Sequence, residues 1–156
     1  MTETHEHRDT SRITEPARRV VRALVTTDPI DAADHADLVS DAAAGAVVTF
    51  AGVVRDHDRG RAVTSIEYVG HPSAGEVVEQ AAADVAARHP IDVVAVSHRL
   101  GHLEVGDTAL AVAVSAAHRR EAFEAASDMV EEIKHRLPVW KRQVFTDGTD
   151  EWVDCP

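Results

Sequence analysis

The sequence contains only two lysines, although it has fourteen arginines. Arginine provides a permanent charge, whereas the lysine amine is compact and can exchange protons or act as a nucleophile. The two lysines, Lys134 and Lys141, lie seven residues apart. Because Pro138 disfavours helix at the residue before it, we expect Lys134 in the last turn of a helix and Lys141 in the extended segment that follows. Both amines would then face one pocket; two surface lysines left by chance are the alternative.

The sequence has a single cysteine, Cys155, which excludes an internal disulfide and fits a reducing compartment. Because Cys155 is next to the last residue, an exposed thiol in the C-terminal tail is the simpler interpretation. No apolar run approaches the roughly 20 residues of a membrane span, and the polar residues 1–9 do not resemble a signal peptide. We therefore expect a soluble, cytoplasmic protein.

Positive charge is also scarce, with 16 basic against 27 acidic residues and a formal net charge of -11. Nucleic-acid binders normally present a basic face, so this class is not expected. The sequence lacks the nucleotide-binding motifs and the serine nucleophile motif. His98 and His102 are four residues apart, but Gly101 and the strand-like context deny them the helical face of a zinc motif. We expect neither a metal site nor a bound cofactor.

The length of 156 residues suffices for one domain that folds without disulfides. Residues 1–19 are polar, mixed in charge and without periodicity, which predicts a disordered tail. Residues 20–156 are expected to form a single domain. Hydrophobic periodicity and turn signals predict helices at 29–43, 71–90 and 119–137, and strands at 20–27, 45–55, 62–69, 92–100, 108–116, 139–144 and 151–154.

This order of elements predicts an α+β fold with a mixed or antiparallel sheet and three helices packed on it. We expect strand 62–69 to return beside strand 45–55. The expected buried stripe of the third helix consists of Phe123, Ala126, Val130, Ile133 and Leu137. In the strand that follows, Trp140 is expected to anchor the chain in the core, whereas Lys141 shares the opposite face with Val139 and Gln143.

A second candidate site lies at Ala116–Arg120, where the third helix begins. A helix N-terminus presents unpaired amide groups and the positive end of the helix dipole, so His118 and Arg119 there suit an anion such as phosphate. The alternative is that the arginines pair with acidic side chains of the same helix. Arg55, at the end of strand 45–55, adds a third cation, although a charged hairpin tip explains it equally well.

Three segments, in this order and at these separations, resemble the large, catalytic subunit of molybdopterin synthase. They are GAVVTFAGVVRDH at 45–57, SAAHR at 115–119 and KHRLPVWKR at 134–142. The segment HRLG at 98–101, followed by Gly106 and Asp107, also fits the pattern of this family. The resemblance extends from about residue 20 to residue 153.

The resemblance implies an α+β subunit that forms a homodimer and binds one small ubiquitin-like sulfur-carrier protein at each end, which gives a heterotetramer. It implies that the C-terminal Gly-Gly thiocarboxylate of the carrier enters a pocket of the large subunit. There cyclic pyranopterin monophosphate is converted to molybdopterin by insertion of two sulfurs, a step of molybdenum cofactor biosynthesis.

The resemblance also implies roles for individual residues. Lys134 and Lys141 match the two catalytic lysines beside the inserted carrier tail. The residues His118, Arg119 and Arg55 match those that hold the pterin phosphate, and part of this set comes across the dimer interface.

Three further residues match positions near the substrate. Arg142 and Gln143 fall in the substrate-contacting stretch after the second lysine, where many members have Glu in place of Gln143. Phe50 fits the apolar wall of the pocket, although it is equally compatible with a core phenylalanine.

The chemistry of these residues agrees with that reaction. The carrier tail and the phosphate bring two anions into one cavity, and fixed cations offset their repulsion. No cysteine is required, because the sulfur arrives on the carrier. The alternative is a non-catalytic dimeric module that binds a carrier protein or a phosphorylated metabolite, which would need the phosphate-binding cations but not the lysines.

Overall fold

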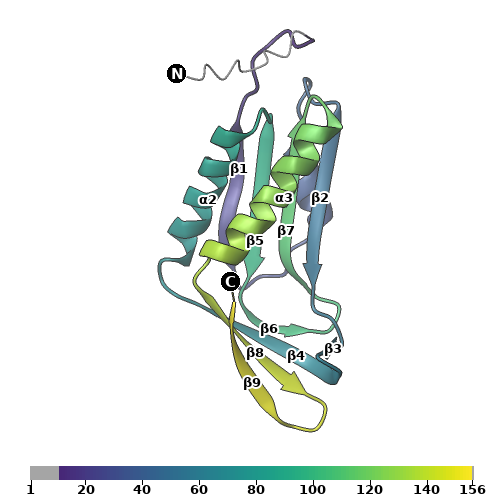
Figure 1. The fold of residues 1–156 in the computed structure, drawn as a ribbon, viewed down its shortest axis with the longest axis vertical. Helices are drawn as coiled ribbons and strands as arrows, with labels where there is room; N and C mark the ends of the chain where they lie inside the picture. Colours follow the sequence, from purple (N-terminus) through teal and green to yellow (C-terminus); the bar gives the residue numbers. More distant parts are fainter. Residues whose placement is uncertain (1–10, 156) are drawn as a thin grey trace, which may run out of the picture.

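A computed structural model describes residues 11–155 of the chain (Figure 1). The three helices are α1 (Ala32–Leu38), α2 (Ala74–Arg88) and α3 (Arg119–Arg136). The strands are β1 (Arg19–Thr26), β2 (Ala46–Val53), β3 (His57–Asp58), β4 (Arg61–Gly70), β5 (Val93–Arg99), β6 (Gly101–Glu104), β7 (Thr108–Ala116), β8 (Val139–Phe145) and β9 (Asp150–Cys155). The predicted α+β class with three helices is confirmed.

The first sheet has the strand order β1-β5-β7-β2. It is mixed, because β1 runs parallel to β5 whereas the β5–β7 and β7–β2 pairs are antiparallel. Helices α2 and α3 cover one face (Figure 1), and α1 contacts β2, β5 and β7. Residues 109–116 of β7 are all buried, as an uninterrupted apolar strand covered on both faces predicts.

The remaining strands form a second, antiparallel sheet in the order β3-β4-β8-β9, and β6 also pairs with β4 on the side away from β8. The expected pairing of strand 62–69 with strand 45–55 is therefore wrong. The backbone of Val54 exchanges hydrogen bonds with Asp107 and Gly106 just before β7. The Val54 side chain is buried with Val63 and Phe145, which belong to the second sheet. The chain therefore leaves the first sheet at the end of β2 and enters the second.

The first helix is shorter than predicted and ends at Leu38 instead of near residue 43. It begins after Asp31, whose carboxylate accepts a hydrogen bond from the Ala33 amide at 2.8 Å. Beyond the helix, the Asp41 carboxylate accepts a hydrogen bond from the Ala43 amide at 2.8 Å. Such a local side-chain turn competes with helical hydrogen bonding, which explains the early end.

The buried stripe of α3 differs from the prediction, most clearly at Phe123. Phe123 is 61% exposed, whereas the fully or nearly buried residues of this helix are Ala122, Ala125, Ala126, Met129 and Ile133. The stripe follows spacings of three and four from residue 122, and residue 123 lies one step off this face. The predicted burial of Ile133 and Leu137 is confirmed.

Residues 11–18, which the sequence placed in a disordered tail, contact the domain. Arg12 forms an ion pair with the buried Asp92. The Arg18 guanidinium donates hydrogen bonds to carbonyl groups at the end of α2, among them those of Ala87 and His89 at 2.8 Å each. The rest of the predicted tail, residues 1–10, lies outside the described residues. None of the helices within residues 11–155 is long and apolar enough to cross a membrane.

Candidate active site

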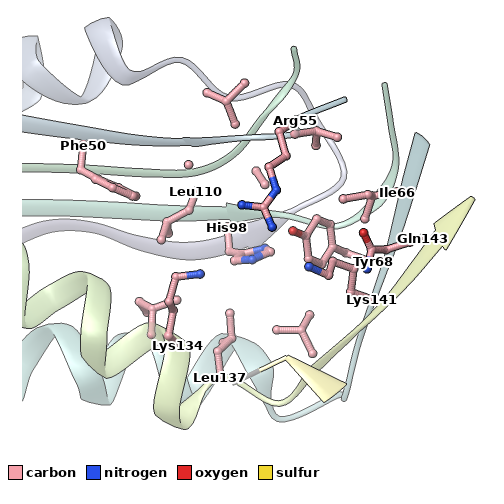
Figure 2. A pocket seen from close by; sticks show the side chains of 16 residues that line it. Phe50, Arg55, Ile66, Tyr68, His98, Leu110, Lys134, Leu137, Lys141 and Gln143 are labelled. Atoms are coloured by element: carbon pink, nitrogen blue, oxygen red, sulfur yellow. The ribbon is translucent and has the colours of Figure 1, made fainter. Parts of the chain in front are cut away.

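A cavity of about 240 Å³ lies where the two sheets meet the C-terminal end of α3. Its walls come from β2, β4, β5, β7, β8 and α3 (Figure 2). The cavity therefore gathers residues from segments that are far apart in the sequence.

The second sheet supplies one wall through the register of β4 and β8. Tyr68 lies opposite Lys141, and Ile66 lies opposite Gln143. Because side chains alternate between the faces of a strand, Lys141 and Gln143 share the face that lines the cavity, together with Val139. The predicted orientation of these three residues is confirmed.

The expected anchoring of this strand by Trp140 is wrong. The Trp140 side chain is 39% exposed on the opposite face of β8. Its neighbours across the sheet on that face include the exposed Val69 on β4. No helix contacts this sheet extensively in the described chain, so the outward-facing side of β8 lacks the cover that would bury a tryptophan.

The end of α3 brings the first lysine to the same cavity. The helix stops at Leu137, whose ψ of 118° is extended, as expected for a residue before proline. Ile133 and Leu137 line the cavity, and the amine of Lys134 points into it (Figure 2). The prediction that Lys134 and Lys141 face one pocket from a helix end and a strand is confirmed.

Arg55 and Phe50 reach the cavity from β2 and the segment after it. The guanidinium of Arg55 donates hydrogen bonds from Nε to the His57 carbonyl at 2.9 Å and from Nη2 to the Asp58 carboxylate at 3.1 Å. It points toward the cavity in Figure 2. Phe50 is 37% exposed and belongs to the wall of the cavity, not to the core.

Gln143 is buried, and its amide nitrogen donates a hydrogen bond of 2.9 Å to Asp58. This bond, followed by that from Arg55, holds the pKa of the Asp58 carboxyl below its usual value. Desolvation opposes the shift, and the nearby charge of Lys141 adds to it. Asp58 is therefore a carboxylate that ties the β3–β4 hairpin to two residues of the cavity.

His98, which belongs to the family segment HRLG at 98–101 and was not expected to bind a metal, lines the cavity at 7% exposure. Its ring meets that of Tyr68 edge-on, with 5.0 Å between centroids. Burial lowers the pKa of His98 to about 4; its hydrogen bond with the Arg99 carbonyl opposes the shift, and the charge of Lys134 adds to it. The signals in the sequence were the family segment HRLG at 98–101 and a histidine two residues after the apolar run 93–96.

Three of the predicted site residues lie away from the cavity. His118 precedes the first residue of α3 and Lys134 lies in its last turn, so a rise of 1.5 Å per residue separates them by about 24 Å. Arg119 is exposed at the same end of the helix, and the His118 imidazole lies 3.1 Å from the Ser11 hydroxyl. Arg142 lies on the outer face of β8, where it pairs with Asp150 at 2.7 Å and with Glu67 at 3.6 Å.

The arrangement is suited to anions. Arg55, Lys134 and Lys141 bring three cations to one partly apolar cavity that also contains a neutral histidine. Within residues 11–155, no group of three or more His, Cys, Asp or Glu side chains is placed to hold a metal ion. Fixed cations of this kind can bind an anionic substrate and stabilise negative charge that develops on it.

Comparisons with known proteins agree with these features. Residues 25–136 match the profile of the MoaE protein family. The chain is 43% identical over 118 residues to the molybdopterin synthase catalytic subunit of Pyrococcus abyssi, which covers 75% of this chain and 79% of that protein.

Solved structures share the fold. The crystal structure of molybdopterin synthase from Staphylococcus aureus superposes with a TM-score of 0.78 at 29% identity, over 84% of this chain and 96% of that one. A complex of subunits 1 and 2 of the molybdopterin-converting factor of Helicobacter pylori gives a TM-score of 0.62 over 87% of this chain and 88% of that one. At 16% identity, the latter likeness shows the fold alone.

The family match covers most of the domain, and it includes the cavity residues from Phe50 to Lys134. The chain therefore belongs to the MoaE family, that of the molybdopterin synthase catalytic subunits.

Proposed function

We propose that this chain transfers sulfur from the C-terminal thiocarboxylate of a small carrier protein to cyclic pyranopterin monophosphate, which forms the dithiolene of molybdopterin. The observation that carries the proposal is the meeting of Lys134 and Lys141 in one cavity with Arg55. The resemblance gives both lysines a catalytic role, and they are the only lysines of the chain.

In this proposal the lysines act on the carrier tail. Each of two carrier thiocarboxylates supplies one sulfur. As its sulfur bonds to a side-chain carbon of the pterin, a C–O bond of that carbon breaks and the oxygen leaves as water or stays on the phosphate as its ring opens. The carrier C–S bond also breaks, and water supplies the oxygen that restores the carrier carboxylate. Negative charge develops on the carbonyl oxygen of the tail, and ammonium groups at Lys134 and Lys141 can stabilise it and donate protons. Arg55 binds the phosphate, Gln143 contacts the substrate, and Phe50 forms the apolar wall.

The proposed assembly is a homodimer with one carrier subunit at each end. His118 and Arg119 cannot reach the cavity of their own chain, because they lie at the start of α3, a continuous helix of 18 residues, and Lys134 lies in its last turn. This separation supports the expectation that they complete the phosphate site of the neighbouring subunit. Arg142 is held in ion pairs on the outer face, so we assign it no contact with the substrate of its own subunit. The cytoplasm is the proposed location.

The direct test is reconstitution with a thiocarboxylated carrier and cyclic pyranopterin monophosphate. We expect molybdopterin formation by the wild type and its loss in Lys134→Ala and Lys141→Ala, with carrier binding nearly unchanged. His135→Ala is the matched control, because His135 is exposed beside Lys134 and does not line the cavity. Equal turnover in the wild type and both lysine variants would instead support a non-catalytic module that binds the carrier or a phosphorylated metabolite.

A further inference from the structure

Asp58 does not line the cavity, yet both of its carboxylate oxygens bind residues that do. Oδ1 accepts a hydrogen bond from Nη2 of Arg55 at 3.1 Å, and Oδ2 accepts one from Nε2 of Gln143 at 2.9 Å. The Arg55 side chain is 67% exposed, and a long exposed side chain samples many rotamers unless contacts restrict it. Asp58 therefore limits where the Arg55 guanidinium can go.

The contacts also fix which edge of Arg55 is available to a ligand. Nε is bound to the His57 carbonyl and Nη2 to Asp58. Within residues 11–155, Nη1 has no such bond, so its two hydrogens and the second hydrogen of Nη2 are the donors that can be offered to an anion. An arginine held in this way can bind a phosphate oxygen with little further loss of side-chain freedom.

The bond between Asp58 and Gln143 imposes a chemical rule on the two positions. Gln143 is 3% exposed, so its amide needs a partner, and Asp58 provides one. A glutamate at position 143 would place a second carboxylate within hydrogen-bond distance of Asp58, and two such groups cannot both be ionised without strong repulsion. The pair tolerates one acid and one amide. This rule gives a physical reason for glutamine at a position where the family resemblance implies glutamate in many members.

We propose that Asp58 is a positioning residue, which orients Arg55 for the substrate phosphate and forms with Gln143 a matched acid–amide pair whose two members can be exchanged. The phosphate ligand in this statement rests on the proposed function. The exchange of acid and amide rests only on the geometry of residues 58 and 143, so the two parts can fail separately.

The test is a double-mutant cycle of Asp58→Asn, Gln143→Glu and the combined variant. Asp58→Asn leaves one acceptor oxygen where Arg55 and Gln143 each donate to one, so we expect KM for cyclic pyranopterin monophosphate to rise about tenfold with kcat nearly unchanged. Gln143→Glu should raise KM at least as much. The combined variant restores one acid and one amide, so its KM should return to within about threefold of the wild type. Asp56→Asn, an exposed change in the same turn, is the control without effect.

Thermal unfolding of the same four proteins provides a readout that does not require sulfur transfer. Gln143→Glu should lower Tm at pH 7 and regain it on acidification, because one of the two facing carboxylates then takes up a proton. The combined variant should not show this recovery. If the rises in KM and the decreases in Tm of the two single variants simply add in the combined variant, the positioning role is overturned. It is also overturned if Asp58→Asn changes kcat and leaves KM unaltered. A wild type without turnover but with the expected Tm cycle would refute only the proposed function.

Discussion

The Nδ1 atom of His98 lies 2.8 Å from the backbone carbonyl oxygen of Arg99. A carbonyl only accepts hydrogen bonds, so Nδ1 carries the proton and Nε2 of the neutral ring is left as an acceptor. Since burial lowers the pKa of His98 to about 4, the ring is neutral at pH 7. The cavity therefore places an uncharged acceptor among its cations, and its protonation state can be measured.

Lys134→Ala should raise the pKa of His98. The positive charge of Lys134 contributes to the low pKa of this imidazole, after burial, because like charges disfavour the protonated ring. The measurement is an NMR titration of the His98 ring protons. His135→Ala, which removes a neighbouring exposed histidine, should leave the titration unchanged. An unaltered His98 pKa in Lys134→Ala would show that the charge of Lys134 does not act on the ring.

His98 should make the protein less stable in mild acid. Its pKa falls from about 6.5 in the unfolded chain to about 4 in the folded one, so the unfolded state binds more protons between these values. Stability is unaffected above pH 6.5 and decreases as the pH falls toward 4, by about 3 kcal/mol in total. Urea unfolding of the wild type and of His98→Gln at pH 7 and pH 4.5 checks the sign. Parallel losses in the two proteins would exclude His98 as the source.

Lys141→Arg should lose most sulfur transfer while it still binds the carrier. The substitution keeps the positive charge opposite Tyr68 but replaces a compact amine with a bulkier guanidinium that does not give up its proton near neutral pH. Turnover and carrier affinity are measured separately on the same preparation. Near-wild-type turnover would show that Lys141 acts only through its positive charge.

Two inactive variants should complement each other if the sites are shared. One carries Lys141→Ala, and the other carries His118→Ala together with Arg119→Ala. Random exchange of subunits gives one intact site in each mixed dimer, so about a quarter of the wild-type activity should return on mixing. Light scattering on the unmixed proteins should report dimers. No recovery on mixing, despite confirmed exchange, would place all functional residues of a site in one chain.

Gly45→Ala should destabilise the fold by about 1–3 kcal/mol. A Cβ at this position would lie 2.6 Å from the backbone carbonyl oxygen of Ala117, so the start of β2 or the turn before α3 would have to move. Gly75→Ala is the matched control, because its Cβ would meet nothing within 4 Å and alanine favours the α2 helix. Denaturant unfolding should therefore move the two variants in opposite directions.

The sequence by itself determined the local features. The alternation along residues 139–143 placed Lys141 and Gln143 on one face, and Pro138 ended the helix that carries Lys134. The spacing of apolar residues also identified Ala126 and Ile133 on the buried face of that helix and Leu137 just after it. These features depend on backbone preferences and on side-chain periodicity within a few turns or strand residues, which a single segment contains.

The tertiary structure alone decided which segments meet. Strand β4 pairs within a second sheet and not with β2. This pairing brings Tyr68 against His98 and Asp58 against Gln143. The same packing exposed Trp140 and put His118 at the far end of α3 from the lysines. Strand pairing and burial depend on contacts between residues far apart in the sequence, and local periodicity carries no information about which partner strand completes them.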